Sequence, residues 1–239
     1  MSIERRIPVV SYDVMTDSVI RPSALFRYYQ QVAGEHLDSL GLTYNDTREK
    51  KCVFVITRMK NVFYKPIKRY DEIDIKTSSR EIKGAVFTRD YSVMRDGELV
   101  AEASTQWALI DIDSRRICRP SVYADYFTQK EELCSFTGIK KCVFENPLDN
   151  EYIYKVVFFD IDENRHMNNT RYTDICLDAI GGLSEGEWIS EVSVDFLSEA
   201  KLGDTLRICF TKNGNEYCFS ADNLDTSKVC FNARIVISK

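Results

Sequence analysis

The spacing of apolar residues in the first half of the chain predicts a helix followed by a series of strands. After Pro22, apolar side chains recur every three or four positions, which is typical of a helix with one buried face. Gly41 follows the last of these positions and is suited to the backbone conformation that ends helices. We therefore expect a helix from Pro22 to about Leu40, after a short extended segment over residues 6–15.

Runs rich in Val, Ile, Thr and aromatic residues follow this helix and predict strands. They cover residues 52–64, 72–82, 85–95 and 99–112. The sequence Asp96-Gly97 lies between the last two runs, and this dipeptide favours the two-residue turns of β-hairpins. The first half therefore predicts one helix and an antiparallel sheet.

The second half repeats the same order of elements. It predicts a strand over 152–159, a helix over 170–180 that ends at Gly181-Gly182, and strands over 188–197, 205–211, 217–223 and 229–238. Residues 65–75 and 198–208 also resemble each other, which pairs Asp71 with Asp204 at an offset of 133 residues. Pairing the two helices through Tyr28 and Tyr172 gives an offset of 144. The pattern indicates a duplication.

A helix and several antiparallel strands can bury a core by packing helix on sheet. The predicted fold is therefore α+β, with two tandem hotdog units. Each unit is a long helix wrapped by a curved antiparallel sheet, and we expect the two sheets to pair side by side. The expected boundaries are 1–120 for the N-terminal hotdog unit, 121–150 for a polar linker, and 151–239 for the C-terminal hotdog unit.

The composition of the chain mainly excludes some classes of protein and partner. Hydrophobic residues make up 44% and charged residues 29% of the 239-residue chain, as in ordinary folded proteins. The net charge of −5 disfavours nucleic acid or an anionic membrane as the main partner. There is no apolar run near the ~18 residues of a membrane span and no secretory signal pattern. We therefore expect a cytoplasmic protein with neither nucleic acid nor a membrane as its partner.

The cysteine and histidine content argues against a metal site. The eight cysteines form no Cys-x-x-Cys pair, and His36 and His166 are the two imidazoles of the chain. Structural zinc needs ligand pairs at short spacing. We expect reduced, mostly buried thiols, no metal and no cofactor.

A polar segment between the strand and the helix of the second half contains the candidate chemistry. In an extended segment alternate residues share a side, so Asp162, Asn164 and His166 would converge while Glu163 and Arg165 point away. A carboxylate, a carboxamide and an imidazole can orient water, donate to an oxygen and move a proton during acyl transfer.

The next residues, Asn168 and Asn169, are good helix N-caps. A helix that begins there would direct backbone N–H groups and the positive end of its dipole at the carbonyl oxygen of a substrate. One such preorganised donor lowers an acyl-transfer barrier by about 3 kcal/mol. On the residues alone, a capped surface loop is the more common explanation of such a segment.

The run Asp-x-Asn-x-His-x-Asn-Asn, with an apolar strand before it and Tyr172 after it, resembles the acyl-acyl carrier protein (acyl-ACP) thioesterases of plants and bacteria. The resemblance extends over both halves and includes the length, the order of elements and the region of Trp107. It implies hydrolysis of fatty acyl-ACP thioesters to free fatty acids in fatty acid biosynthesis, with acyl carrier protein as the partner.

The resemblance also implies the site residues. The Asp, Asn and His of the family fall on Asp162, Asn164 and His166, and its downstream acidic residue falls on Glu199. The plant members have a cysteine after that acidic residue. This chain has Ala200 there, so a cysteine-based triad is excluded.

Hydrolysis through carboxylates is what remains. Glu199 or Asp162 would activate water or attack as a nucleophile, and the sequence does not choose between these routes. Asn164 would orient the substrate, His166 would position a neighbour or protonate the leaving thiolate, and backbone N–H groups near Asn169 would stabilise the oxyanion. A surface glutamate paired with a lysine is the simple alternative for Glu199.

The first half lacks this set, because its equivalent segment, residues 13–18, contains neither His nor Asn. His36 lies on the first helix, where a hydrogen-bonded or exposed histidine is expected. We therefore predict one active site per chain, in the second unit. The first unit would line an acyl tunnel, with candidate residues Phe26, Tyr29, Val53, Val55 and Met59.

Three other interpretations stay open. A hotdog acyl-CoA thioesterase would use the same chemistry on another carrier, a noncatalytic acyl-binding hotdog protein would bind without hydrolysis, and a dehydratase would leave Asn164 and Glu199 without a role. Basic clusters that could meet an acidic carrier are Lys65, Lys68 and Arg69, Arg115, Arg116 and Arg119, and Lys140 and Lys141. The acyl length, the saturation preference and the oligomeric state, a homodimer included, are not determined.

Overall fold

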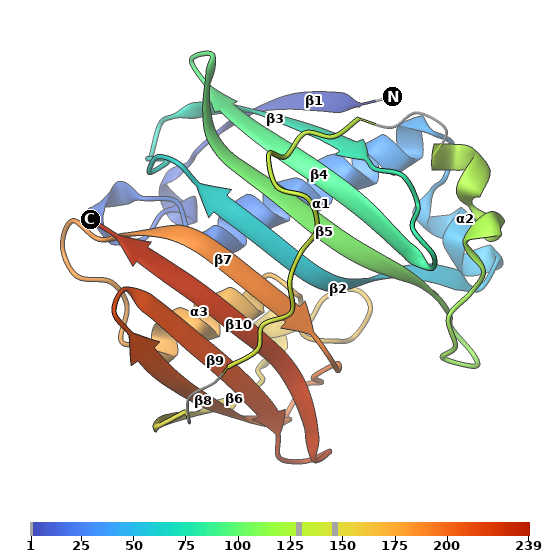
Figure 1. Cartoon of the computed structure of the whole chain (residues 1–239). Helices are drawn as coiled ribbons and strands as arrows, with labels where there is room; N and C mark the ends of the chain where they lie inside the picture. The colour runs from blue at the N-terminus through green and yellow to red at the C-terminus, as the bar shows by residue number, and fades with distance from the viewer. Residues whose placement is uncertain (1, 128–130, 145–147) are drawn as a thin grey trace. The chain divides into compact units, whose positions relative to one another are not determined.

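A computed structural model gives the fold of residues 2–127, 131–144 and 148–239, and it confirms the predicted order of elements (Figure 1). The first repeat contains β1 (Ile3–Pro8), α1 (Pro22–Ser39), α2 (Tyr44–Glu49), β2 (Cys52–Phe63), β3 (Glu72–Ser79), β4 (Val86–Arg95) and β5 (Glu98–Asp111). The second repeat contains β6 (Asn150–Lys155), α3 (Arg171–Ala179), β7 (Trp188–Phe196), β8 (Thr205–Asn213), β9 (Glu216–Asn223) and β10 (Lys228–Ser238). Short 3-10 helices occupy Ser11–Asp13, Thr16–Ser18, Pro120–Val122, Ala124–Phe127 and Phe158–Asp160.

Three local features differ from the expectation. The segment predicted to be extended over 6–15 is a strand only as far as Pro8 and then forms the 3-10 helix Ser11–Asp13. The strand predicted over 152–159 ends at Lys155, because the Asp160 carboxylate accepts the N–H of Val157 at 2.8 Å and the chain closes into a 3-10 turn. Helix α2 was not predicted. Its signal was a capping box in which Thr43 and Asp46 bond reciprocally.

The two repeats have the same sheet topology. In the first, antiparallel strands pair in the order β1-β3-β4-β5-β2. In the second, they pair in the order β6-β8-β9-β10-β7, which is the same order when β1 to β5 are matched with β6 to β10. Topology therefore confirms the duplication that the sequence predicts.

Backbone hydrogen bonds confirm one of the sequence pairings residue by residue. Val9 N–H donates to Asp71 O at 2.9 Å, and Val156 N–H donates to Asp204 O at 2.9 Å. These bonds hold the ends of β1 and β6 to the segments that lead into β3 and β8. Asp71 and Asp204 are therefore equivalent, as their offset of 133 residues predicts.

Each sheet packs against a helix, as a hotdog fold requires. In the first repeat α1 lies behind β4, β5 and β2 in Figure 1, and the ring of Tyr29 on α1 stacks on Tyr91 of β4 at 4.4 Å between centroids. In the second repeat the ring of Tyr172 on α3 meets Phe196 and Phe231 edge to face. The fold is thus two tandem hotdog units.

The compact units do not follow the chain in a simple order. One contains Met1–Val9, Arg27–Tyr64 and Tyr70–Ile139, and the other contains Val10–Phe26, Lys65–Arg69 and Lys140–Lys239. We call these the first and second units. The predicted boundaries at residues 120 and 150 stay a prediction.

Buried carboxylates hold the chain that follows the first repeat. In the first unit, Asp90 accepts the N–H of Leu133 and Glu102 accepts the N–H of Ser135, at 3.2 and 3.0 Å. In the second unit, Asp195 accepts the N–H of Cys142 at 2.9 Å. Residues 128–130 and 145–147 of the predicted linker lie outside the described residues.

The backbone predicts opposite effects for two glycine substitutions. Gly203 has φ +87°, so Gly203→Ala should lower the free energy of unfolding by about 1 kcal/mol. Gly34 lies in the interior of α1, and Gly34→Ala should raise that free energy by about 0.5–1 kcal/mol. An added Cβ meets no atom within 4 Å at either position, so packing does not confuse the comparison. Urea unfolding of both variants measures the difference, and equal effects would contradict the backbone explanation.

Candidate active site

Residues 160–168, which we call the site hairpin, form a tight turn between β6 and α3. Asp162 N–H donates to the carbonyl of His166 at 2.9 Å, and Arg165 has φ +66°, which reverses the chain. The expectation that this segment is extended is therefore wrong. Four polar residues in a row are typical of a turn, and this signal outweighs the alternating pattern.

The turn changes how the candidate side chains are placed. Asp162 and His166 lie opposite each other in the hairpin, while Asn164 lies at its exposed tip. The Asp162 carboxylate accepts the N–H of Asn164 at 2.8 Å, as aspartate side chains do when they stabilise turns. Asp162 therefore has a structural role in addition to any role in catalysis.

Glu199 reaches this hairpin from a distant part of the sequence. Met167 N–H donates to the carbonyl of Ala200 at 2.8 Å, which sets the residues before them side by side. His166 Nε2 then lies 3.0 Å from Glu199 Oε2. The side chains of His166 and Glu199 are 24% and 38% exposed, so a substrate can reach both.

The contact defines which nitrogen of the imidazole is available. A neutral imidazole has one N–H donor and one acceptor nitrogen. Since Nε2 faces a carboxylate, Nε2–H donates to Glu199 and Nδ1 is left as the acceptor. An imidazole held in this way by a carboxylate is the arrangement that general acid–base catalysis uses.

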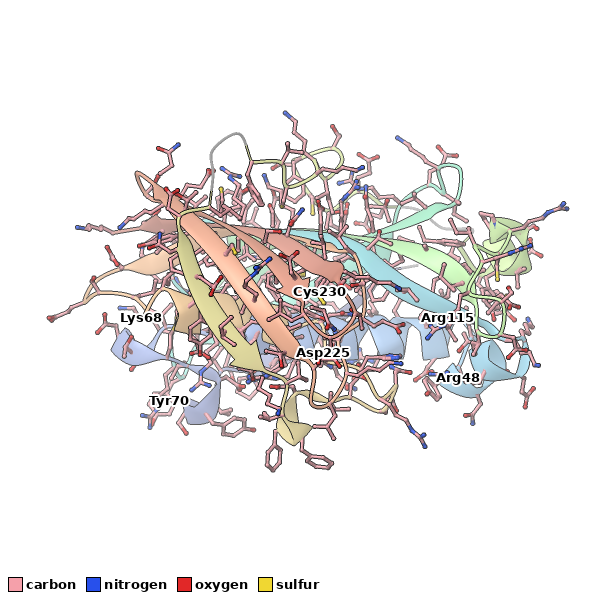
Figure 2. The ribbon with its side chains drawn as sticks, turned by 90° about the horizontal axis from the view of Figure 1, so that it is seen from below. Arg48, Lys68, Tyr70, Arg115, Asp225 and Cys230 are labelled. Carbon is pink, nitrogen blue, oxygen red and sulfur yellow. The ribbon has the colours of Figure 1, made fainter. Side chains whose placement is uncertain are left out.

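A buried phenol lies beside the pair, and two buried thiols lie in the same unit. Burial, with smaller contributions from Cys230, Glu199 and others, raises the pKa of Tyr172 well above its usual value, so Tyr172 remains a neutral phenol beside the site. Burial also raises the pKa values of the Cys230 and Cys176 thiols. Cys230 is labelled in Figure 2. Thiols of this kind are poor nucleophiles, which agrees with a site that does not use cysteine.

A buried carboxylate that the sequence analysis did not single out, Asp160, anchors the hairpin. It is 1% exposed and accepts hydrogen bonds from Tyr154 Oη and Val157 N–H, both at 2.8 Å, and from Arg171 Nε at 3.0 Å. Burial and the bond to Asp160 raise the pKa of Tyr154 to about 12. Asp160 thereby ties the end of β6 and the start of α3 to the hairpin.

The predicted helix caps, Asn168 and Asn169, lie two residues and one residue before Thr170, the N-cap position of the helix. Helix α3 begins at Arg171, with Thr170 before it. The side-chain oxygen of Asn168 accepts the N–H and the hydroxyl of Thr170 at 3.0 and 2.9 Å, so Asn168 caps the turn that leads into α3. Asn169 lies within this turn and is half-buried. Its role in binding an oxyanion stays a prediction.

The residues predicted to line an acyl tunnel are divided between the units. Phe26 belongs to the second unit and is buried, and Tyr29, Met59 and the half-buried Val55 belong to the first. Tyr29 Oη donates to Asn61 Oδ1 at 2.8 Å, so its polar end is satisfied inside the first unit. The tunnel role of these residues stays a prediction. His36 is also in the first unit, with Nδ1 2.7 Å from Arg89, and is buried and hydrogen-bonded as expected.

The first repeat contains the same hairpin backbone, in residues 13–21, which we call the first hairpin. In the site hairpin the bonds run from Asp162 N to His166 O, from Asn168 N to Asp160 O and from Met167 N to Ala200 O. In the first hairpin the corresponding bonds run from Met15 N to Val19 O, from Arg21 N to Asp13 O and from Ile20 N to Ile67 O. All six are between 2.8 and 2.9 Å long. The two hairpins therefore share these three backbone bonds, while their tips differ: Asp17 and Ser18 both have positive φ, whereas Arg165 has it and Asn164 does not.

This correspondence gives the residues that replace the candidate set in the first repeat. Met15 is equivalent to Asp162, Val19 to His166, and Pro66 to Glu199. The first repeat thus has the hairpin but not the candidate catalytic side chains, as the sequence predicts.

The correspondence also corrects the helix alignment. The two hairpins are offset by 147 residues, and so are the backbone bonds that follow them, from Ala24 N to Arg21 O and from Arg171 N to Asn168 O. The pairing of Tyr28 with Tyr172, at an offset of 144, is therefore wrong by three residues. Its error arose because an aromatic residue occurs by chance at the shifted position.

The fold and the site together define a double-hotdog protein with a polar hairpin in its second repeat. The sequence profile of the acyl-ACP thioesterase N-terminal domain matches residues 1–128, and that of the acyl-ACP thioesterase C-terminal domain matches residues 146–236. The two matches cover most of the chain. The protein belongs to the acyl-ACP thioesterase family.

Individual relatives are distant in sequence and similar in fold. The chain is 24% identical over 227 residues to oleoyl-acyl carrier protein thioesterase 1, chloroplastic, of Arabidopsis thaliana, which covers 86% of this chain and 62% of that protein. It therefore spans less than two thirds of the length of this relative. An acyl-ACP thioesterase from Bacteroides thetaiotaomicron superimposes with a TM-score of 0.87 at 19% identity, covering 99% of this chain and 98% of that one. The 12:0-ACP thioesterase from Umbellularia californica gives 0.85 at 16% identity, covering 99% and 97%.

Within the described residues, none of the helices is both long and apolar enough to cross a membrane.

The buried anchor predicts a difference between two aspartates that bind the same arginine. Asp160→Ala removes the acceptor of Tyr154, Val157 and Arg171 and should lower the free energy of unfolding by about 3 kcal/mol. Asp174→Ala removes a second, more accessible partner of Arg171 and should cost about 1 kcal/mol or less. Urea unfolding compares the two. Equal losses would show that Asp160 is not the anchor.

Proposed function

We propose that the protein hydrolyses fatty acyl thioesters carried on acyl carrier protein and releases free fatty acids, in fatty acid biosynthesis. The observation that carries this proposal is the contact between His166 and Glu199, at 3.0 Å, in a chain of the acyl-ACP thioesterase family. The two residues are 33 positions apart, and the pairing of two backbone segments brings them together.

In the proposed reaction Glu199 is the base and His166 orients it. The carboxylate takes a proton from water, or attacks the thioester carbonyl itself, and the tetrahedral intermediate then expels the thiolate. On the water route, the proton that Glu199 takes up passes on to the leaving thiolate, and His166 assists this transfer through its bond to Glu199. On the covalent route, a water molecule then hydrolyses the acyl-glutamate anhydride and restores Glu199. Asn164 and the backbone N–H groups around Asn169 bind the developing oxyanion. Asp162 keeps the turn in shape and so positions Asn164.

The acyl chain is proposed to bind along apolar side chains of the first repeat, on α1 and β2. Phe26, Tyr29, Val55 and Met59 are the candidates, and three of these are already buried from water. Burial of a hydrocarbon chain among such residues contributes about 0.8 kcal/mol for each methylene group, so affinity should depend on acyl length.

Exposed basic residues of the second unit support an acidic carrier protein as the partner. Arg165 in the site hairpin and Lys201, two residues after Glu199, are exposed. Lys65, Lys68 and Arg69 belong to the same unit and flank Ile67, the equivalent of Ala200, and all three are exposed. Lys68 is marked in Figure 2. Basic residues around a site speed the association of an acidic partner. A cytoplasmic location and a homodimer stay predictions.

Matched variants in the two hairpins test the catalytic assignment. His166→Ala and Glu199→Ala should each lower kcat/KM for acyl-ACP by at least about tenfold, because positioned acid–base groups contribute 10²- to 10⁴-fold. The double variant should lose little more than either single variant, because the two side chains act as one unit. Steady-state hydrolysis assays on folded protein measure both effects.

The first hairpin supplies the controls for this test. Val19→Ala and Met15→Ala alter the positions equivalent to His166 and Asp162, and each should leave kcat/KM within about twofold. Circular dichroism confirms that every variant is folded. Full activity of His166→Ala, or an equal loss in Val19→Ala, would remove the proposed site.

A comparison of carriers tests the proposed partner. Acyl-ACP should be hydrolysed with a kcat/KM at least about tenfold above that of the matched acyl-CoA and the uncharged acyl-pantetheine. Reversing the charges of Lys65, Lys68 and Arg69 to glutamate should remove most of that advantage at low salt and leave acyl-pantetheine unaffected.

Lys140 and Lys141 give the matched control for charge. They precede Cys142, which bonds to Asp195 on the face of the sheet that is turned away from α3. Reversal of these two charges should leave the preference for acyl-ACP intact. Equal rates with acyl-CoA and acyl-ACP in the unmodified protein would instead assign coenzyme A esters as the substrates.

A further inference from the structure

Two thiols of the first unit lie in direct contact although 66 residues separate them in the sequence. Cys52 Sγ is 2.6 Å from Cys118 Sγ. An S–S bond is about 2.05 Å long, so closing this gap needs a movement of about 0.5 Å. Neither cysteine belongs to the candidate active site.

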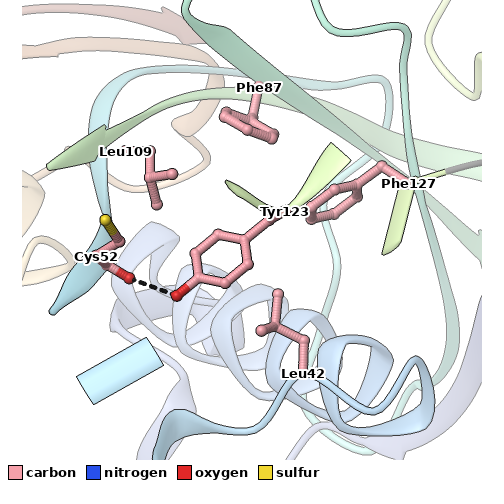
Figure 3. Close-up of a cluster of buried hydrophobic side chains, with 6 residues drawn as sticks. All are labelled: Leu42, Cys52, Phe87, Leu109, Tyr123 and Phe127. Carbon is pink, nitrogen blue, oxygen red and sulfur yellow. Dashed lines mark hydrogen bonds between the residues drawn. The ribbon is translucent and has the colours of Figure 1, made fainter. Parts of the chain in front are cut away.

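The backbone fixes both cysteines where they meet. Cys52 is the first residue of β2 and pairs with Asp111 of β5. Cys118 follows the turn after β5, and its N–H donates to the carbonyl of Leu109 at 2.8 Å. Tyr123 Oη donates to the carbonyl of Cys52 at 3.0 Å, which Figure 3 shows as a dashed line. The contact therefore lies between two anchored segments.

The two thiols differ in their exposure to solvent. Cys52 is 8% exposed and packs in the cluster of Figure 3, with Leu42, Phe87, Leu109, Tyr123 and Phe127. Cys118 is half-buried and packs against the edge of this cluster. One thiol can thus react with a small molecule from solution, and the other lies behind it.

We propose that Cys52 and Cys118 form a reversible disulfide by exchange with a small-molecule disulfide such as oxidised glutathione. This site is independent of the thioesterase site and of the proposed function.

The exchange is balanced in two steps. The Cys118 thiolate attacks one sulfur of oxidised glutathione, a bond to that sulfur forms, and one molecule of glutathione leaves as its thiolate. The Cys52 thiolate then attacks Cys118 Sγ and expels the second glutathione. The protein loses two electrons and two protons, and oxidised glutathione gains both to become two thiols.

The alternative to a disulfide is a metal ion bound by Cys52 and Cys118. The carboxylate of Asp111 lies with both sulfur atoms in a group whose ligand atoms are within 4.8 Å of one another. However, two thiolates on a tetrahedral zinc ion with bonds of about 2.3 Å are about 3.8 Å apart, much farther than these thiols. The Asp111 carboxylate also accepts two bonds from Ser114, at 2.7 Å each. The geometry therefore favours the disulfide.

The environment of Cys118 makes the exchange depend on pH. Burial, followed by the bond to Cys52 and the charge of Asp111, raises the pKa of the Cys118 thiol to about 12. Tyr123 is a further titratable group beside this pair, and Lys51 lies near it through the charge of Asp111. Since the thiolate reacts, the initial rate of exchange should rise about tenfold per pH unit between pH 7 and 10. Asp111→Asn removes a negative charge and should speed the exchange at pH 8.

The experiment uses the full chain, reduced and then incubated with oxidised glutathione. Free thiols are alkylated, and peptide mapping by mass spectrometry locates the cross-link. We expect a peptide that joins Cys52 to Cys118, and a melting temperature that rises by about 5–15 °C and falls back after reduction. Cys52→Ser and Cys118→Ser should each abolish the rise. Cys209→Ser, at another half-buried cysteine, should keep it.

Three results would overturn the proposal. The first is full alkylation of Cys52 and Cys118 after oxidation, with no joined peptide. The second is a stable glutathione adduct on Cys118 in the unmodified protein, because it would show that Cys52 does not reach the adduct. The third is one equivalent of zinc retained after dialysis against zinc chloride, together with loss of that zinc in Cys118→Ser, which would assign the place to a metal.

Discussion

The geometry of the second repeat depends on how one buried carboxylate is neutralised. Asp160 is almost fully buried, and an ionised carboxylate in that position needs donors on several sides. Tyr154 at the end of β6, Val157 in the turn after it and Arg171 at the start of α3 supply them. These donors come from three elements, so satisfying one charge fixes the strand, the turn and the helix relative to one another within the unit. The hairpin with His166 is built on this frame.

A comparison with the first hairpin shows which of these interactions occur in both repeats and which occur in the second repeat. Asp13 occupies the place of Asp160 and is buried too, and the backbone bonds around it are the same. Ala24, by contrast, stands where the second repeat has Arg171. The arginine at the position of Arg171 is therefore not shared, whereas both turns are polar, with Thr16, Asp17 and Ser18 in the first hairpin and Glu163, Asn164 and Arg165 in the second. The backbone bonds and the buried aspartate are common to both repeats, whereas the candidate catalytic side chains are in the second repeat.

Much of this architecture could be predicted from the sequence, because apolar spacing reports directly which face of an element is buried. The helix over α1 and the strands from β2 to β5 and from β7 to β10 were found in this way. The hairpin was missed because alternation was treated as evidence for an extended chain, although Asp162 to Arg165 has the composition of a turn. A stronger signal for the duplication was also present: Val9-Val10 and Val156-Val157 are each followed, two residues later, by an aromatic residue, an aspartate and an aliphatic residue.

The contacts between distant segments could not be read from spacing. Glu199 was assigned through a family resemblance, and nothing in the residues between it and His166 shows that Met167 pairs with Ala200. The same limit applies to Cys52 and Cys118, whose separation of 66 residues hides a contact that only the register of β2 and β5 creates. Local periodicity predicts helices and strands. Contacts between distant residues depend on how the strands pair, and the spacing of residues in a single sequence does not show that pairing.

The His166–Glu199 pair is partly exposed, which explains why the residues that stabilise the site hairpin are different from those proposed to catalyse the reaction. A pair that is 24% and 38% exposed is screened by water, and exposed polar pairs of this kind contribute about 0–1 kcal/mol to folding. The hairpin is stabilised instead by Asp160 and by backbone bonds that do not involve the His166 or Glu199 side chains. Because water weakens the pair, a substrate that covers it strengthens the interaction at the moment when a proton must move. Binding of the acyl chain and its carrier would then complete the site electrostatically, with no rearrangement of the hairpin.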